Sequence, residues 1–129
     1  MFLNSFHHVA IICSDYNKSK HFYKEILGLK IIREIYRAER CSYKLDVALS
    51  ESFFIELFSF PNPPLRLSQP EAVGLRHLAF GVNNIENFIE YLAKNQIICE
   101  PLRIDEFTQK KFTFFNDPDN LPLELYEIS

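Results

Sequence analysis

The sequence lacks tryptophan and contains no apolar run near the ~20 residues that a membrane span needs. Neither charge predominates, because 14 Lys and Arg stand against 17 Asp and Glu, for a net charge of −3. This balance excludes a basic surface for nucleic acid and a polybasic tract for a membrane surface. The first residues, MFLNSFHH, have no basic region followed by an apolar stretch, so we expect no secretory signal.

Cysteine is scarce as well. The three cysteines, Cys13, Cys41 and Cys99, are odd in number, widely spaced and without a CxxC motif. This pattern predicts neither a disulfide framework nor a thiolate zinc site, and a reducing cytoplasm fits it best. Because Cys13 and Cys99 lie in the apolar runs AIICS and QIICE, we expect buried, unreactive thiols at both positions.

The composition that remains is that of a globular protein. The chain has 129 residues, which favours one domain, and 47% of them are hydrophobic against 24% charged. Thirteen Phe and six Tyr supply enough apolar material for a sizeable core, with a surplus for a pocket or an interface.

The order of predicted elements occurs twice. The first half reads as a strand over 6–13, a helix that begins after Asp15 and stops at Gly28, and three strands, over 29–36, 43–49 and 52–60. The second half reads as a strand over 75–82, a helix capped by Asn83 or Asn84 and ended by a left-handed Asn95, and strands over 97–104, 110–115 and 121–128.

This repeat predicts an α+β protein built from two βαβββ modules. We expect the first module over 1–60, a proline-rich linker over 61–72 and the second module over 73–129. A half of this size buries too little surface to be stable on its own, so the two halves should pack together or pair across a dimer.

The repeat places polar residues at matching positions. The first strand of each half carries a histidine, His8 and His77, and the last strand carries a glutamate, Glu56 and Glu124. Strand alternation puts each of these four residues on the face opposite the aliphatic positions, which should pack on the helices. His7 alternates onto the helix-packed side, so His8 is the candidate.

Two imidazoles and two carboxylates form a mixed ligand set that suits Zn²⁺, Ni²⁺, Co²⁺, Mn²⁺ or Fe²⁺. Any one of these residues alone is more often an ordinary strand residue, but the matched spacing and facing of all four favour a metal site. Such a cation can polarise a carbonyl and stabilise an enediolate while a neighbouring carboxylate moves a proton.

The chain resembles the vicinal oxygen chelate superfamily, with its glyoxalase/bleomycin-resistance/dioxygenase fold, and within it glyoxalase I-like proteins of the lactoylglutathione lyase family. Four segments carry the resemblance: HHVAIICSDYNKSKHFYKEILGLK at 7–30, FFIELFSF at 53–60, LRHLAFGV at 75–82 and FTFFNDPDNLPLELYE at 112–127. In the last segment Asn120 stands at the usual glycine of a DPDG-type turn, and Asn also tolerates the left-handed region.

The resemblance implies curved mixed sheets around one divalent metal, held by His8, Glu56, His77 and Glu124, in a small cytoplasmic bacterial protein that is often a homodimer. It implies the reaction of glyoxalase I, which isomerises the hemithioacetal of methylglyoxal and glutathione. By this likeness Glu124 is the first candidate for the catalytic base and Glu56 the second.

Two positions depart from the glutathione-using members, which have Arg and Asn where this chain has Ile12 and Phe60. Another thiol adduct, or an unrelated vicinal-oxygen compound, is therefore the alternative substrate. The alternative functions are a metal-dependent thiol transferase or a dioxygenase on the same scaffold, or a protein that sequesters a drug-like ligand. Five basic residues are candidates for an anionic substrate but are more often solvated surface charges: Arg37, Arg40, Arg76, Lys110 and Lys111.

Overall fold

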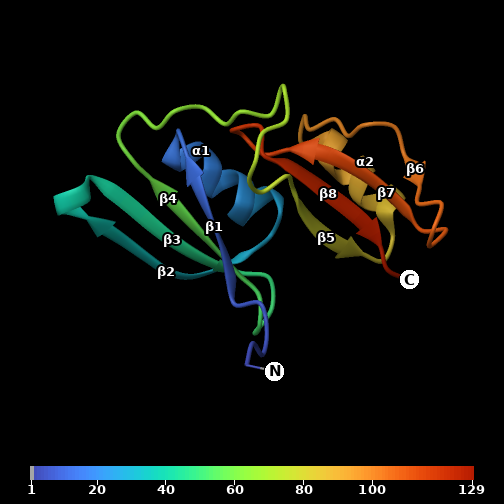
Figure 1. Cartoon of the computed structure of the whole chain (residues 1–129), viewed down its shortest axis with the longest axis horizontal. Helices are drawn as coiled ribbons and strands as arrows, with labels where there is room; N and C mark the ends of the chain where they lie inside the picture. The colour runs from blue at the N-terminus through green and yellow to red at the C-terminus, as the bar shows by residue number, and fades with distance from the viewer. Residues whose placement is uncertain (1) are drawn as a thin grey trace. The chain divides into compact units, whose positions relative to one another are not determined.

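The computed structural model describes residues 2–129, which form two compact units (Figure 1). The first unit ends at Leu65 and the second begins at Arg66, so the division falls within the proline-rich segment 61–72. Each unit contains one four-stranded mixed sheet with its own helix, which confirms the predicted α+β class and the two βαβββ modules.

The first unit follows the predicted order of elements. They are β1 (His8–Cys13), α1 (Tyr16–Lys20), a π-helical turn η1 (His21–Ile26), β2 (Lys30–Arg37), a short 3₁₀ turn η2 (Ala38–Arg40), β3 (Ser42–Ala48) and β4 (Phe54–Ser59). The strand order is β1-β4-β3-β2, with β1 parallel to β4 and the other neighbours antiparallel. This order places the first and last strands of the unit side by side.

The core of the first unit lies between its sheet and its helical segment. The aliphatic face of β4, Ile55 and Leu57, is buried, and so are Phe22 and Tyr23 of η1. The Asp15 side chain caps α1 by accepting from the backbone N–H of Lys18. The helical segment stops as predicted at Gly28, whose φ of +79° is readily accessible to glycine.

The second unit repeats the topology. Its elements are β5 (Leu78–Val82), α2 (Ile85–Lys94), β6 (Arg103–Ile104), β7 (Lys111–Asn116) and β8 (Pro122–Glu127), in the sheet order β5-β8-β7-β6. Strand β5 is parallel to β8, and the buried Leu123 and Leu125 of β8 form the apolar face. The first and last strands of this unit are therefore neighbours too.

Three local predictions about the second unit need correction. The strand predicted over 97–104 is regular only at Arg103–Ile104, because the preceding residues are tied to β7 by isolated bonds such as Glu100 N–H to Phe114 O, 2.9 Å. Helix α2 is capped by Asn84, but Asn95 has a φ of −101° and Gln96 takes the left-handed conformation instead. The strand predicted over 75–82 begins only at Leu78.

Among residues 2–129, no helix is both long and apolar enough to cross a membrane.

Candidate metal-binding pairs

The first candidate pair lies on the two neighbouring parallel strands β1 and β4. His8 is the first residue of β1, and Ala10, on the same face of that strand, pairs in register with Glu56 of β4. The side chains of His8 and Glu56 therefore lie on the face of the sheet opposite Ile55 and Leu57. The His8 Nε2 atom lies 3.6 Å from Glu56 Oε2. The imidazole is 40% exposed and the carboxylate 18% exposed, so the pair is accessible from that face of the sheet.

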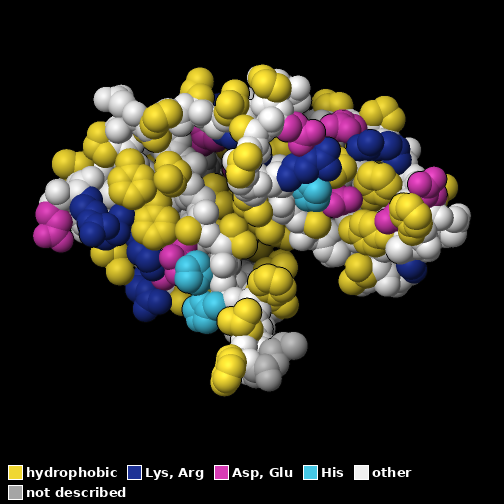
Figure 2. All heavy atoms as spheres, viewed as in Figure 1, with side chains coloured by type: hydrophobic (Ala, Val, Ile, Leu, Met, Phe, Trp, Pro, Cys, Tyr) yellow, Lys and Arg dark blue, Asp and Glu magenta, His cyan; other side chains and the backbone are white. Residues whose placement is uncertain are grey.

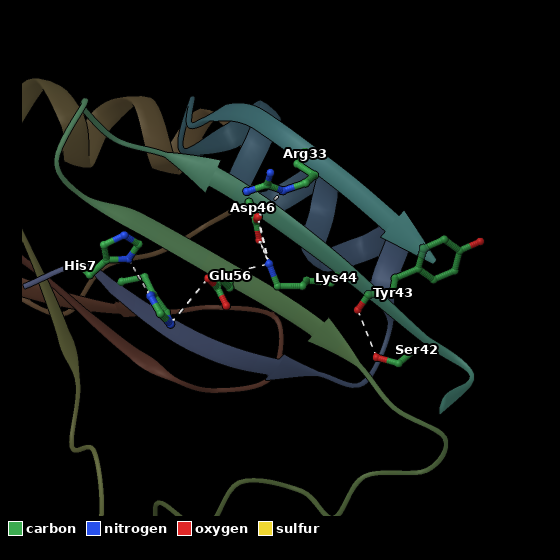
Figure 3. A network of polar contacts seen from close by, with 8 residues as sticks. His7, Arg33, Ser42, Tyr43, Lys44, Asp46 and Glu56 are labelled. Atoms are coloured by element: carbon green, nitrogen blue, oxygen red, sulfur yellow. Dashed lines mark hydrogen bonds and ion pairs between the residues drawn. The ribbon is translucent and has the colours of Figure 1, made fainter. Parts of the chain in front are cut away.

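A charged network continues from Glu56 across β3 and β2 (Figure 3). Lys44 Nζ lies 3.9 Å from Glu56 Oε2 and donates to both oxygens of Asp46, at 2.7 and 3.0 Å. Arg33 Nε donates to the same Asp46 carboxylate at 3.1 Å. Burial alone would raise the pKa of Asp46, but the bonds from Lys44 and Arg33 outweigh it and lower that pKa.

Strand alternation predicted that His7 packs on the helix side of the sheet, but it does not. It precedes the first residue of β1, is exposed, and its ring lies 5.7 Å from the ring of Phe54. Its Nδ1 atom is 2.9 Å from Nδ1 of His8, whose other ring nitrogen, Nε2, is the atom that lies near Glu56. The correction arises because strict alternation ends where the strand ends.

The second candidate pair repeats the first. His77 immediately precedes β5, and Ala79 pairs in register with Glu124 of β8. The His77 Nε2 atom lies 3.1 Å from Glu124 Oε1, with 27% of the imidazole and 14% of the carboxylate exposed. The ring of Phe114 stands edge-on to His77, with the ring centres 5.0 Å apart, and fixes the imidazole from one side.

A cavity of about 520 Å³ opens beside this second pair, within the second unit. Both His77 and Glu124 line it, together with Arg66, Arg76 and Arg103. Figure 2 shows histidine, basic and acidic side chains close together over this unit. Glu124 also lines a second cavity of about 310 Å³. The carboxylate of Glu124 is therefore within reach of a small molecule.

The five basic candidates for an anionic substrate behave differently from one another. Of these, Arg76 lines the cavity, whereas Lys111 pairs with Glu86 at 2.6 Å, and the Arg37 guanidinium lies 4.9 Å over the ring of Phe58. Sequence reasoning missed Arg66 and Arg103. The register of the two-residue strand β6, which brings Arg103 opposite Phe112, could not be deduced from a pattern.

The two positions that depart from the glutathione-using pattern lie in the first unit. Ile12 is 55% exposed on the face of His8, and Phe60 stacks on Phe58 with the ring centres 6.2 Å apart. Both present apolar surface where an arginine and an asparagine would present donors.

Within residues 2–129, Cys13, Cys41 and Cys99 form no disulfide. Cys13 is buried as expected, with 2% exposure, and Cys99 is partly buried. Burial raises the pKa of the Cys99 thiol, which disfavours the reactive thiolate.

The donor set of each unit is a pair of one imidazole and one carboxylate. Within either unit, over residues 2–129, no group of three or more His, Cys, Asp or Glu side chains is placed to hold a metal ion by itself. An imidazole nitrogen beside a carboxylate oxygen is the chemistry that a borderline divalent cation prefers. The donor atoms of each pair thus fit such a cation.

Known proteins are similar to this chain in both sequence and fold. The model of the Glyoxalase/Bleomycin resistance protein/Dioxygenase superfamily matches residues 5–125. The uncharacterized protein YwkD of Bacillus subtilis is 59% identical over 127 residues, 98% of this chain and 99% of its own length. The metallothiol transferase FosB of Staphylococcus saprophyticus is 30% identical, over 96% of this chain and 77% of its own.

A solved structure agrees with these sequence matches. The glyoxalase family protein from Enterococcus faecalis superimposes with a TM-score of 0.91 and 52% identity, over 98% of this chain and 100% of its own. The family model alone covers well over half of the 129 residues. The chain therefore belongs to the Glyoxalase/Bleomycin resistance protein/Dioxygenase superfamily.

Proposed function

We propose that the chain is a metal-dependent lyase or isomerase of the glyoxalase I type, acting on a thiol hemithioacetal or a related vicinal-oxygen compound. The observation that carries this proposal is the repeated pair: each unit holds a histidine Nε2 within 3.6 Å of a glutamate oxygen on neighbouring strands. Two pairs supply two nitrogen and two oxygen ligands without thiolate, a set more typical of catalytic than of closed structural sites.

The residues then have distinct roles. A divalent cation held by His8, Glu56, His77 and Glu124 would supply Lewis acidity towards two neighbouring substrate oxygens. Glu124 is the proposed base, because its carboxylate lines the cavity. It removes the proton from the hydroxyl-bearing carbon and returns it to the adjacent carbonyl carbon, while the substrate's own hydroxyl proton passes to the other oxygen, so the isomerisation needs no oxidant. Glu56 is the second candidate for this role.

The co-substrate and the assembly belong to the same proposal. Ile12 and Phe60 offer apolar surface, which supports a thiol other than glutathione as the co-substrate. A homodimer would let the pair of one chain meet the pair of another, whereas a monomer would use the two pairs of one chain. Three cysteines that remain thiols fit the reducing cytoplasm of a bacterium.

Metal uptake is the first test. The chelator-treated protein is reloaded separately with Ni²⁺, Zn²⁺, Mn²⁺, Co²⁺ and Fe²⁺, and bound metal is counted per chain. Because four ligands from two pairs form one site, we expect one equivalent per chain. Two equivalents would mean that each pair binds its own ion. If no metal is taken up, the ligand assignment is wrong and a ligand-sequestering protein becomes the better interpretation.

Turnover is the second test. Thioester formation from methylglyoxal is followed with glutathione and with cysteine as the thiol, in excess metal. Substituting Glu124→Gln should lower the rate by roughly 10²- to 10⁴-fold, because the base is lost while the shape is kept. The matched control is Glu90→Gln on the exposed side of α2, which should be unchanged. Metal uptake without thioester formation from either thiol would contradict lyase chemistry on methylglyoxal adducts.

A thiol transferase is the second candidate function, favoured by the 30% identity to a metallothiol transferase. The two reactions leave different products. A lyase of this type forms a thioester, which hydroxylamine cleaves, whereas a transferase that adds a thiol to an electrophilic carbon forms a thioether, which hydroxylamine leaves intact. A metal-dependent product resistant to hydroxylamine would support the transferase.

A further inference from the structure

The cavity beside His77 and Glu124 is unusually rich in guanidinium groups. Three arginines, Arg66, Arg76 and Arg103, line a space of about 520 Å³ within the second unit. They come from separate places, the segment that precedes β5 and the short strand β6. The three are not equivalent, because their partners differ.

Arg103 lies over two aromatic rings. Its guanidinium carbon lies 5.0 Å from the ring centre of Phe112 and 5.5 Å from that of Phe114, the ring that also contacts His77. A single hydrogen bond of 3.0 Å ties one terminal nitrogen to Glu100, and half of the side chain, 51%, stays exposed. A guanidinium confined by two rings loses little side-chain conformational freedom when it binds a ligand through its exposed edge.

Arg66 carries a fixed charge that no acid compensates. Its Nε donates to Ser68 Oγ at 2.8 Å, and one terminal nitrogen donates to the carbonyls of Leu75 and Arg76, at 2.7 and 3.0 Å. Within residues 2–129, no carboxylate forms an ion pair with Arg66. Arg76, by contrast, is occupied by both oxygens of Glu71, at 2.5 and 3.2 Å.

The formal charges on the walls of the cavity sum to zero, but they are unevenly paired. The three arginines face three glutamates, Glu71, Glu100 and Glu124, with His77 beside them. Because Arg66 has no carboxylate partner in the described part of the chain, it keeps a local positive charge on the cavity wall, and a positive, concave site attracts anions even without a cation.

We infer that this cavity is an oxyanion subsite, and that the substrate carries a carboxylate or phosphate group that Arg103 and Arg66 bind next to the His77–Glu124 pair. The inference rests on the proposed function for the identity of the reacting site, and on the two arginines for the class of substrate. Guanidinium groups match carboxylate and phosphate oxygens in geometry as well as charge.

The test uses the chelator-treated chain, so that the arginines are probed apart from any metal. Inorganic phosphate and acetate are titrated at constant ionic strength, and backbone amide shifts are followed by NMR. We expect saturable shifts in the segments 66–77 and 100–103. Because one charge-assisted hydrogen bond is worth about 1.5 kcal/mol, Arg103→Met should weaken binding about tenfold.

Two further variants make the titration decisive. Arg103→Lys keeps the charge and should retain part of the affinity, which separates loss of charge from loss of folding. Lys18→Met removes an exposed charge from α1 of the first unit and should bind as the parent does. Absence of saturable shifts, or equal binding by Arg103→Met and Lys18→Met, would overturn the subsite.

The outcomes separate this inference from the proposed function. Phosphate binding that depends on Arg103, in a protein that takes up no metal, would leave the subsite standing and remove the lyase. Metal uptake in a protein that binds neither anion would overturn the subsite and leave the proposed metal site standing. Binding of phosphate without acetate would assign a phosphate ester, and binding of both would assign a carboxylate-tolerant site.

Discussion

Replacing Asp46 with asparagine should destabilise the first unit and disturb the pair formed by His8 and Glu56. Asp46 is 5% exposed and accepts hydrogen bonds from two cations, Lys44 and Arg33. Asparagine keeps the shape and one acceptor but removes the charge. The freed Lys44 ammonium, 3.9 Å from Glu56, then has that carboxylate as its nearest acid and should compete with a metal for it.

The magnitude follows from the geometry of these contacts. Removing one partner of a buried ion pair costs about 3–5 kcal/mol. Arg33 is 60% exposed, so water compensates part of that loss, and the remaining amide oxygen compensates another part. We therefore expect Asp46→Asn to lower the free energy of unfolding by about 2 kcal/mol, a reduction of roughly 5–10 °C in Tm for a chain of this size.

Urea denaturation at several pH values is the assay. Because the folded-state pKa of Asp46 is lowered, its stabilisation is present above the unfolded pKa of about 3.9 and is lost as the pH falls through the folded value. The difference in the free energy of unfolding between the parent and Asp46→Asn should therefore be largest at pH 7 and should shrink below about pH 4.

The control for this prediction is Glu90→Gln, which removes an exposed pair with Lys94 at 3.7 Å. It should cost less than about 0.5 kcal/mol. An Asp46→Asn variant no less stable than this control, or a gap that persists unchanged into acid, would refute the reasoning.

Three further outcomes follow from single residues. His7→Ala should weaken metal affinity by about tenfold in calorimetric titration, because His8 loses the ring that orients it, while His21→Ala on the exposed face of η1 should not. Asn120→Ala should lower stability by about 1 kcal/mol and Asn120→Gly should not, since φ is +66°, as the Tm of each variant will show. Tyr126→Phe removes a 2.9 Å bond to Asp105 and should speed amide exchange in the loop 105–109.

The placement of the candidate pairs could be predicted from the sequence because it depends on a period of two. In FFIELF the aliphatic positions Ile55 and Leu57 must face the helices, which leaves Glu56 on the other face whatever the exact strand ends. The same argument applies to Glu124 between Leu123 and Leu125.

Features that depend on strand ends and on contacts across the sheet could not be predicted. His7 lies one residue outside β1, where alternation no longer applies, and its ring turned towards His8. The run from Ile97 to Ile104 has strand-like residues, but only Arg103 and Ile104 pair regularly with β7. Asparagine tolerates a positive φ better than glutamine, yet Gln96 adopts it because the chain must turn after Asn95 has closed its bond to Leu92.

The two units show which parts of the duplicated frame are constrained and which are not. On the strand beside each glutamate, Asp46 pairs in register with Glu56, whereas Phe114 pairs with Glu124. The His–Glu pair is the same in both units because it needs only two adjacent parallel strands. The neighbouring antiparallel strand is free to differ, and it surrounds Glu56 with charge and Glu124 with aromatic rings. The second arrangement places a cavity beside its pair, with aromatic walls and the Arg103 guanidinium over Phe114, the combination that orients a small anionic molecule. What the two units share is the His–Glu pair, and what distinguishes the second unit is the aromatic and basic cavity beside that pair.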